Sequence, residues 1–184
     1  MLNLPNKLSI LRILLIPVFV ATIMYYSPEK DFLRLLAIGI FLLAILTDAL
    51  DGYIARITGQ RTKLGTILDP LADKLLLITV FICLSMVNTW PAEFKLAPGI
   101  VIIVISRDVI IVLGSAVLHM INGKLQITPT ILGKITTTLQ MATILTLLLQ
   151  LRIFSIVMYA MILFTVVSGL DYIRIGSRLF NEGS

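Results

Sequence analysis

Four aspartates lie at regular spacing within an otherwise apolar chain: Asp48, Asp51, Asp69 and Asp73. Carboxylates at membrane depth are costly and tend to mark an ion pathway, a proton relay or a catalytic centre. Residues three or four apart share a helix face, so each pair would present two carboxylates together. Two such pairs suit divalent cations held by hard oxygen ligands, and paired cations recur in phosphoryl transfer. The spacing therefore predicts phosphate chemistry next to a membrane.

The composition places the chain in the membrane class. Of its 184 residues, 58% are hydrophobic and only 14% are charged, and the mean hydropathy is +1.03. Apolar segments, each of about the 20 residues that a bilayer needs, cover roughly 8–26, 34–57, 67–88, 98–120, 130–150 and 153–175. We expect an all-α, polytopic membrane protein with six transmembrane helices in one bundle, forming a single domain over residues 1–184.

The basic residues indicate how the segments are oriented, because cytoplasmic loops carry an excess of Lys and Arg. One side of the membrane would hold Lys7, Arg56, Arg61, Lys63, Lys124, Lys134, Arg174 and Arg178, and the other Lys30, Arg34, Lys95 and Arg152. Both termini and the four aspartates would then be cytoplasmic, in the cell inner membrane. The cations of this chain, with its formal charge of +5, are spread among membrane segments. They therefore suit anionic lipids and phosphate-bearing substrates better than nucleic acid.

The aspartates belong to a longer pattern, D-x2-D-G-x2-A-R-x8-G-x3-D-x3-D. Its fixed positions are Asp48, Asp51, Gly52, Ala55, Arg56, Gly65, Asp69 and Asp73. This pattern resembles the motif of the CDP-alcohol phosphatidyltransferase family, and chain length and topology agree over essentially the whole sequence. The resemblance implies a divalent-metal enzyme, usually a homodimer. Such an enzyme moves a phosphatidyl group from a CDP-linked lipid such as CDP-diacylglycerol to an alcohol and releases CMP.

The resemblance also implies a role for each motif residue. Two ions, Mg2+ or Mn2+, would be held by the four carboxylates, and Asp73 is the candidate base for the acceptor hydroxyl. The CDP group would lie against Asp48, Gly52, Ala55, Arg56, Gly65 and Asp69. In the alternative interpretation the acids only form salt bridges with Arg56, Lys63 and Lys74. That alternative leaves the two glycines at motif spacing unexplained.

Arginines inside the apolar segments are further candidates. An arginine in mid-membrane costs at least about 2.5–3.5 kcal/mol on insertion scales, so Arg107 must face the bundle interior. We predict that it binds the phosphate of the acceptor, and the alternative is a stabilising pair, with Asp171 as a partner. Arg12 is a candidate for reaching lipid head groups or the substrate's phosphate. The predicted acceptor-phosphate set is Arg107, Lys134, Arg61 and Lys63.

Two acceptor alcohols are compatible with the sequence. The N-terminal NLPN through DPLADKLL resembles bacterial phosphatidylglycerophosphate synthases, which favours glycerol 3-phosphate. Against it, those enzymes carry a second arginine where this chain has Ser115. The S-R-D triplet ending at Asp108 and the pattern over 129–140 resemble mitochondrial-type cardiolipin synthases, whose acceptor is phosphatidylglycerol. We predict glycerol 3-phosphate, with phosphatidylglycerol as the alternative.

A different class of protein, a small ion-coupled transporter, would also place acids in a membrane. Its acids would bind the coupling ion rather than a catalytic metal. The aspartates cluster at one membrane face, however, and no inverted repeat is evident. The sequence therefore favours an enzyme of phospholipid biosynthesis.

Overall fold

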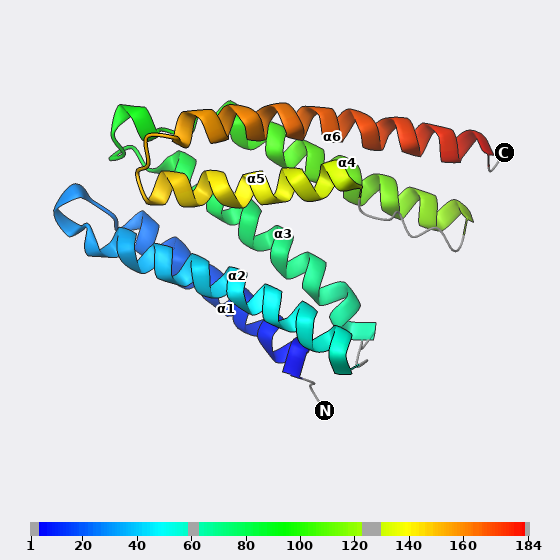
Figure 1. Cartoon of the computed structure of the whole chain (residues 1–184), viewed down its shortest axis with the longest axis horizontal. Coiled ribbons are helices and arrows are strands. Elements are labelled where there is room, and N and C mark those ends of the chain that lie inside the picture. The colour runs from blue at the N-terminus through cyan, green and yellow to red at the C-terminus, as the bar shows by residue number, and fades with distance from the viewer. Residues whose placement is uncertain (1–3, 59–62, 123–129, 183–184) are drawn as a thin grey trace. The chain divides into compact units, whose positions relative to one another are not determined.

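The structure, a computed structural model, describes residues 4–58, 63–122 and 130–182, with side chains described for 7–54, 57, 71–114 and 130–177. Within these ranges the chain forms long α-helices and no strands (Figure 1). The helices are α1 (Leu4–Met24), α2 (Phe32–Thr58), α3 (Lys63–Met86), α4 (Pro98–Asn122), α5 (Ile131–Leu148) and α6 (Phe154–Glu182), with short 3-10 turns η1 (Pro28–Lys30) and η2 (Ala92–Phe94). The predicted all-α fold class is confirmed.

The helix ends follow local sequence signals. Pro28 begins η1, Pro98 begins α4, and the Thr130 hydroxyl caps α5 by accepting the Gly133 N–H at 3.1 Å, as expected for a threonine N-cap. Most of the helices are longer than the apolar segments predicted for them. α3 begins at Lys63 rather than near residue 67, and α6 continues to Glu182 rather than ending near 175. A helix can extend past the membrane, so hydropathy does not set its length.

Contacts among the helices divide the chain into two compact units, Met1–Lys95 and Leu96–Ser184. In the first unit, α1 packs against both α2 and α3; in the second, α6 packs against both α4 and α5. Phe19 and Phe41 join α1 to α2 with ring centroids 6.3 Å apart. Tyr26, just after α1, stacks on Trp90, just after α3, at 4.6 Å. The prediction of one domain over residues 1–184 stays a prediction.

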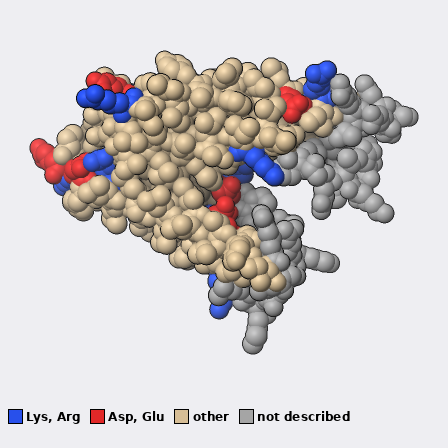
Figure 2. Space-filling view, viewed as in Figure 1, with Lys and Arg blue, Asp and Glu red and all other residues tan. Residues whose placement is uncertain are grey.

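The outer surface of the helices is apolar. Leu14, Ile156 and Leu163 are 61%, 72% and 62% exposed, which a water-soluble monomer rarely tolerates over many positions. Among the described residues, five helices contain stretches long and apolar enough to cross a membrane, and the first half of α3 carries charged residues instead. Residues other than Lys, Arg, Asp and Glu cover most of the described part of the face shown in Figure 2, and the charged residues form small groups. The protein is a multi-pass membrane protein.

Candidate active site

The first aspartate pair is held together by an arginine from a neighbouring helix. Asp48 and Asp51 lie about one turn apart on α2, and both carboxylates contact Arg12 of α1. Arg12 Nη1 is 2.8 Å from Asp48 Oδ1, an ion pair without hydrogen-bond geometry. Arg12 Nη2 donates a hydrogen bond of 2.7 Å to Asp51 Oδ2. One guanidinium thus contacts both carboxylates of the pair.

Exposure differs across this cluster. The side chain of Arg12 is 0% exposed and that of Asp51 only 4%, whereas the side chain of Asp48 is 39% exposed. A buried charge is tolerated only when it is paired. Arg12 therefore closes the inner side of the cluster, and Asp48 leaves its outer side open.

The contacts of Arg12 were missed by the sequence analysis, which named it only as a candidate for reaching lipid head groups or a substrate phosphate. The structure places its guanidinium on the two motif carboxylates instead. A signal was available. Arg12 lies near the middle of α1, and Asp48 lies just past the middle of α2. Consecutive helices are usually neighbours in space, and in an antiparallel pair these two positions lie at similar depth.

The other motif residues are described only in part. Asp73 is half-buried on α3, and α3 packs on α1 rather than mainly on α2. Around Gly52 an added Cβ would meet nothing within 4 Å, so this position is open and not closely packed. Arg61 lies outside the described residues, and the same holds for the side chains of Ala55, Arg56, Lys63, Gly65 and Asp69. The convergence of both aspartate pairs therefore stays a prediction.

The chemistry of the α2 pair fits a divalent cation. Its two carboxylates already converge on one positive group at 2.7 and 2.8 Å, and carboxylate oxygens are the ligands that Mg2+ and Mn2+ prefer. Among the described side chains, no three acidic, His or Cys side chains gather into a metal-binding group. Further ligands would have to come from Asp69, whose side chain is not described, or from Asp73 and water.

A second polar cluster surrounds Arg107 in the middle of α4. The Arg107 side chain is 5% exposed, and its Nη1 lies 2.7 Å from Asp108 Oδ1. Its Nη2 donates a hydrogen bond of 2.9 Å to Ser168 Oγ on α6. The guanidinium carbon lies 5.6 Å from the centre of the Tyr172 ring, a cation–π distance. Arg107 is buried, as its insertion cost required, but among the described residues its ionic partner is Asp108 and not Asp171.

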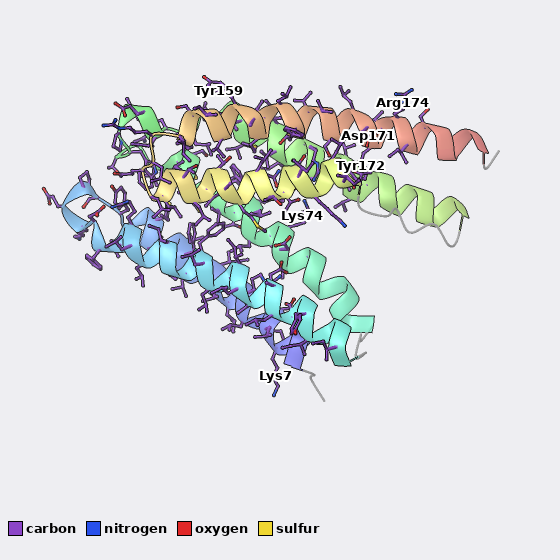
Figure 3. The ribbon with its side chains drawn as sticks, viewed as in Figure 1. Lys7, Lys74, Tyr159, Asp171, Tyr172 and Arg174 are labelled. Carbon is purple, nitrogen blue, oxygen red and sulfur yellow. The ribbon has the colours of Figure 1, made fainter. Side chains whose placement is uncertain are left out.

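The first turn of α5 lies against this arginine. A Cβ on Gly133 would be 3.1 Å from both Arg107 Nη2 and the Tyr172 hydroxyl oxygen. The Tyr172 hydroxyl accepts the Thr130 N–H at 3.2 Å, and Figure 3 shows Tyr172 on α6 facing α5. Lys134, next to Gly133, is exposed. Sequence reasoning missed Gly133 and Tyr172 as neighbours of Arg107.

We expect Gly133→Ala to destabilise the protein relative to Gly169→Ala by about 1–3 kcal/mol, the usual cost of overpacking. At Gly133 the new methyl would press on Arg107 and Tyr172 at 3.1 Å, whereas at Gly169 the nearest atom, Arg107 Cγ, is 3.6 Å away. Both variants gain helix propensity, so comparing them cancels most of that gain. Thermal unfolding of the two variants in detergent is the measurement. Equal melting temperatures would contradict the close packing around Arg107.

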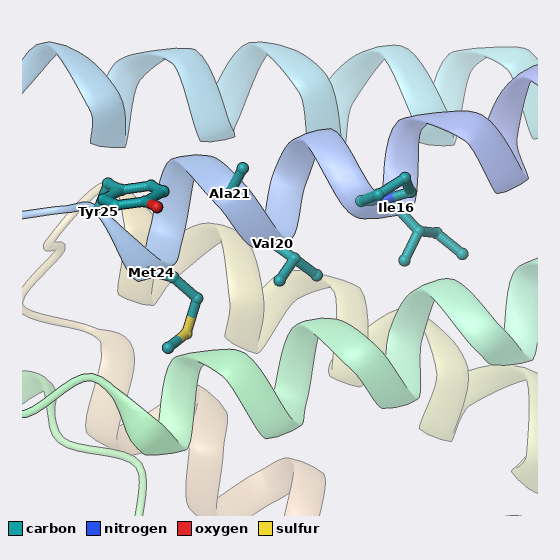
Figure 4. Close-up of a pocket in the computed structure, with 6 residues that line it drawn as sticks. Ile16, Val20, Ala21, Met24 and Tyr25 are labelled. Carbon is teal, nitrogen blue, oxygen red and sulfur yellow. The ribbon is translucent and has the colours of Figure 1, made fainter.

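An apolar groove of about 660 Å³ runs along the second half of α1 (Figure 4). It is lined by Ile16, Pro17, Val20, Ala21, Met24 and Tyr25. None of the predicted site residues lines it, and it offers no charged group for a phosphate. This groove is therefore not part of the candidate active site.

The fold and the site define a class: a multi-pass helical membrane protein with an acidic motif that suits divalent cations. The chain also matches, over residues 2–167, the family model described as CDP-alcohol phosphatidyltransferase. The protein therefore belongs to the CDP-alcohol phosphatidyltransferase family, and it is an enzyme.

Similar proteins have names that point to two acceptors. A "CDP-diacylglycerol--glycerol-3-phosphate 3-phosphatidyltransferase" of Aquifex aeolicus is 38% identical over 136 residues, covering 74% of this chain and 70% of that protein. A protein of the same name in Bacillus subtilis is 35% identical over 192 aligned residues, covering 94% of both. The human "Cardiolipin synthase (CMP-forming)" is 41% identical over 111 residues, covering 60% of this chain and 33% of that protein.

Proposed function

We propose that this protein transfers the phosphatidyl group of CDP-diacylglycerol to glycerol 3-phosphate and releases CMP, acting as a phosphatidylglycerophosphate synthase of phospholipid biosynthesis. The observation that carries the choice of acceptor is the similarity to the Bacillus subtilis protein, which extends over 94% of both chains. The name of the Aquifex aeolicus relative agrees. The carboxylate pair on α2 would supply part of the cation-binding chemistry that such a transfer needs.

The motif carboxylates would hold two Mg2+ or Mn2+ ions. When bound, such ions neutralise a diphosphate and polarise the phosphorus under attack. Asp48 and Asp51 would offer their oxygens from α2, and Asp69 and Asp73 from α3. The CDP group would lie against Asp48, Gly52, Ala55, Arg56, Gly65 and Asp69.

Asp73 would also act as the general base. Its carboxylate would take the proton of the acceptor hydroxyl, the hydroxyl oxygen would bond to the phosphorus of the phosphatidyl group, and the bond to the CMP oxygen would break. CMP leaves as a phosphate anion, so it needs charge stabilisation more than a proton. Asp73 lies on α3, in the same helical unit as the α2 pair, which supports this role.

The phosphate of glycerol 3-phosphate would bind to Arg107 and Lys134, with Arg61 and Lys63 contributing further positive charge. The buried Nε of Arg107 has no hydrogen-bond acceptor among the described residues, so one donor of its guanidinium remains for a ligand. The positive end of the α5 dipole also lies beside Arg107, because Gly133 in the first turn packs on its Nη2. Helix N-termini favour phosphate.

The proposed reaction would take place at the cytoplasmic face of the membrane. The enzyme would lie in the cell inner membrane as a single domain over residues 1–184, with both termini and the active site facing the cytoplasm. CDP-diacylglycerol would reach the site from the bilayer and the phosphorylated alcohol from water. The family resemblance also favours a homodimer.

Phosphatidylglycerol is the second candidate acceptor, which would make the enzyme a cardiolipin synthase. The human cardiolipin synthase shares 41% identity over 111 residues, higher than the 35% for the Bacillus subtilis protein but over a shorter alignment. A phosphodiester carries a single charge, so one arginine would suffice for it.

Products of the purified protein distinguish the two acceptors. The protein is incubated in mixed micelles with Mg2+ and CDP-diacylglycerol, and with either glycerol 3-phosphate or phosphatidylglycerol, and the lipids are resolved by mass. We expect phosphatidylglycerophosphate from the first mixture and no cardiolipin from the second. Cardiolipin from the second mixture, without product from the first, would overturn the proposed acceptor and leave the family assignment intact.

A further inference from the structure

We propose that Arg12 is a positioning residue for the metal ligands Asp48 and Asp51. Its guanidinium fixes the two carboxylates from the buried side, so that their open side is ready for a divalent cation. The inference rests on the proposed metal-dependent function and adds a residue outside the acidic motif.

The geometry suits a guanidinium and no other side chain. Nη1 and Nη2 of Arg12 contact one oxygen of each carboxylate, at 2.8 and 2.7 Å. The two nitrogens belong to one rigid plane, so they fix the separation between the two oxygens they contact. Lysine carries a single ammonium on a flexible stem, which cannot impose that separation.

Burial indicates that Arg12 positions the carboxylates and does not compete for their cation. Arg12 is fully buried and Asp48 is 39% exposed, so an ion from water would approach on the side of Asp48, away from the guanidinium. If the guanidinium moved away from the two carboxylates, its charge would lie among apolar side chains without a partner, which is costly. The guanidinium therefore stays in place while the site fills.

The charges of the three side chains also support a positioning role for Arg12. Two carboxylates one turn apart repel each other. Without a cation between them, one of the two side chains would tend to rotate away from the other. One guanidinium neutralises half of their charge, so they can converge while negative charge remains for a cation. Groups that orient metal ligands in this way typically contribute about 10–100-fold to metal affinity.

Mn2+ binding tests this role without relying on activity. Free Mn2+ is titrated by electron paramagnetic resonance against purified wild type, Arg12→Lys, Arg12→Gln and Arg34→Gln, with helix content checked by circular dichroism. Arg34→Gln is the matched control, because it breaks a guanidinium–carboxylate pair of 2.7 Å with Asp31 near the other end of α2. We expect about 10–100-fold weaker Mn2+ binding in both Arg12 variants and unchanged binding in Arg34→Gln.

Each outcome has one meaning. Mn2+ binding by Arg12→Lys as tight as in wild type, or tighter, would overturn the positioning role. Loss of helix in both Arg12 variants would overturn it too, because the residue would then serve the fold itself. Wild type that binds no Mn2+ would instead contradict the proposed metal site, which separates that failure from this one.

Discussion

Asp48→Asn is expected to lower the rate of CMP release by about 10²–10³-fold. A bound metal contributes several kcal/mol to the stabilisation of charge in the transition state, and losing about 3–4 kcal/mol corresponds to this change in rate. The amide keeps the size of the side chain but loses the charge that a cation needs. Asp48 is the exposed member of the pair, 39% against 4% for Asp51, so its replacement disturbs the buried core least. CMP release from CDP-diacylglycerol with Mg2+ and glycerol 3-phosphate is the measurement.

The matched control for this variant is Asp31→Asn. Asp31 stands just before α2 and accepts hydrogen bonds of 2.7 and 2.8 Å from Arg34. Those hydrogen bonds lower the pKa of Asp31, so this carboxylate, like a metal ligand, is charged at neutral pH. The control therefore removes one negative charge at the opposite end of α2, outside the motif, and activity should stay near wild type. Full activity in Asp48→Asn, or equal losses in the two variants, would contradict a metal site at Asp48.

Asp73→Asn is expected to lower kcat by about 10²–10⁴-fold, the usual contribution of a positioned general base. Asp73 lies on α3 and not on α2, so its replacement leaves the Asp48–Asp51 pair and its Arg12 contacts in place. Mn2+ affinity should therefore fall less than in Asp48→Asn. Single-turnover CMP release at saturating Mg2+ is the measurement. Recovery of wild-type kcat at high Mg2+ would mean that Asp73 is only a metal ligand.

The sequence predicted the helices well because two simple signals agree. Apolar runs of membrane length recur along the chain, and turn-forming residues such as Pro28 and Pro98 separate them. The pairing of Asp48 with Asp51 on one face followed from their spacing alone. The extensions of α3 from Lys63 and of α6 to Glu182 were not predicted, because polar helix beyond the membrane has no hydropathy signal.

Tertiary partners were harder to predict than helices. Asp171 was named from the sequence as a partner for Arg107. Residues adjacent in sequence do not normally face each other on a helix. In the structure the long side chain of Arg107 reaches its neighbour Asp108 at 2.7 Å and leaves Asp171 aside. Arg12 was likewise considered only for lipid head groups or a substrate phosphate, since no pattern within one helix links it to carboxylates so far along the chain. Such contacts depend on how helices pack, which spacing within one helix does not specify.

The acceptor is the part of the site that sequence alone could not decide. Arg107 and Lys134 suit either glycerol 3-phosphate or phosphatidylglycerol, because both ligands carry a phosphate. The two ligands differ because phosphatidylglycerol is itself a lipid. It needs an apolar path to the site but no particular polar residue. Charge patterns therefore predict where a phosphate would bind but do not name the alcohol.

The dependence of CMP release on a divalent cation tests the central claim most directly. The purified protein is stripped with a chelator, given CDP-diacylglycerol and glycerol 3-phosphate, and assayed before and after Mg2+ or Mn2+ is added back. The account predicts no CMP without the cation and restored CMP release with it. CMP release that persists after chelation, or ion flux in proteoliposomes without any CMP, would contradict a metal-dependent phosphatidyl transfer by these aspartates.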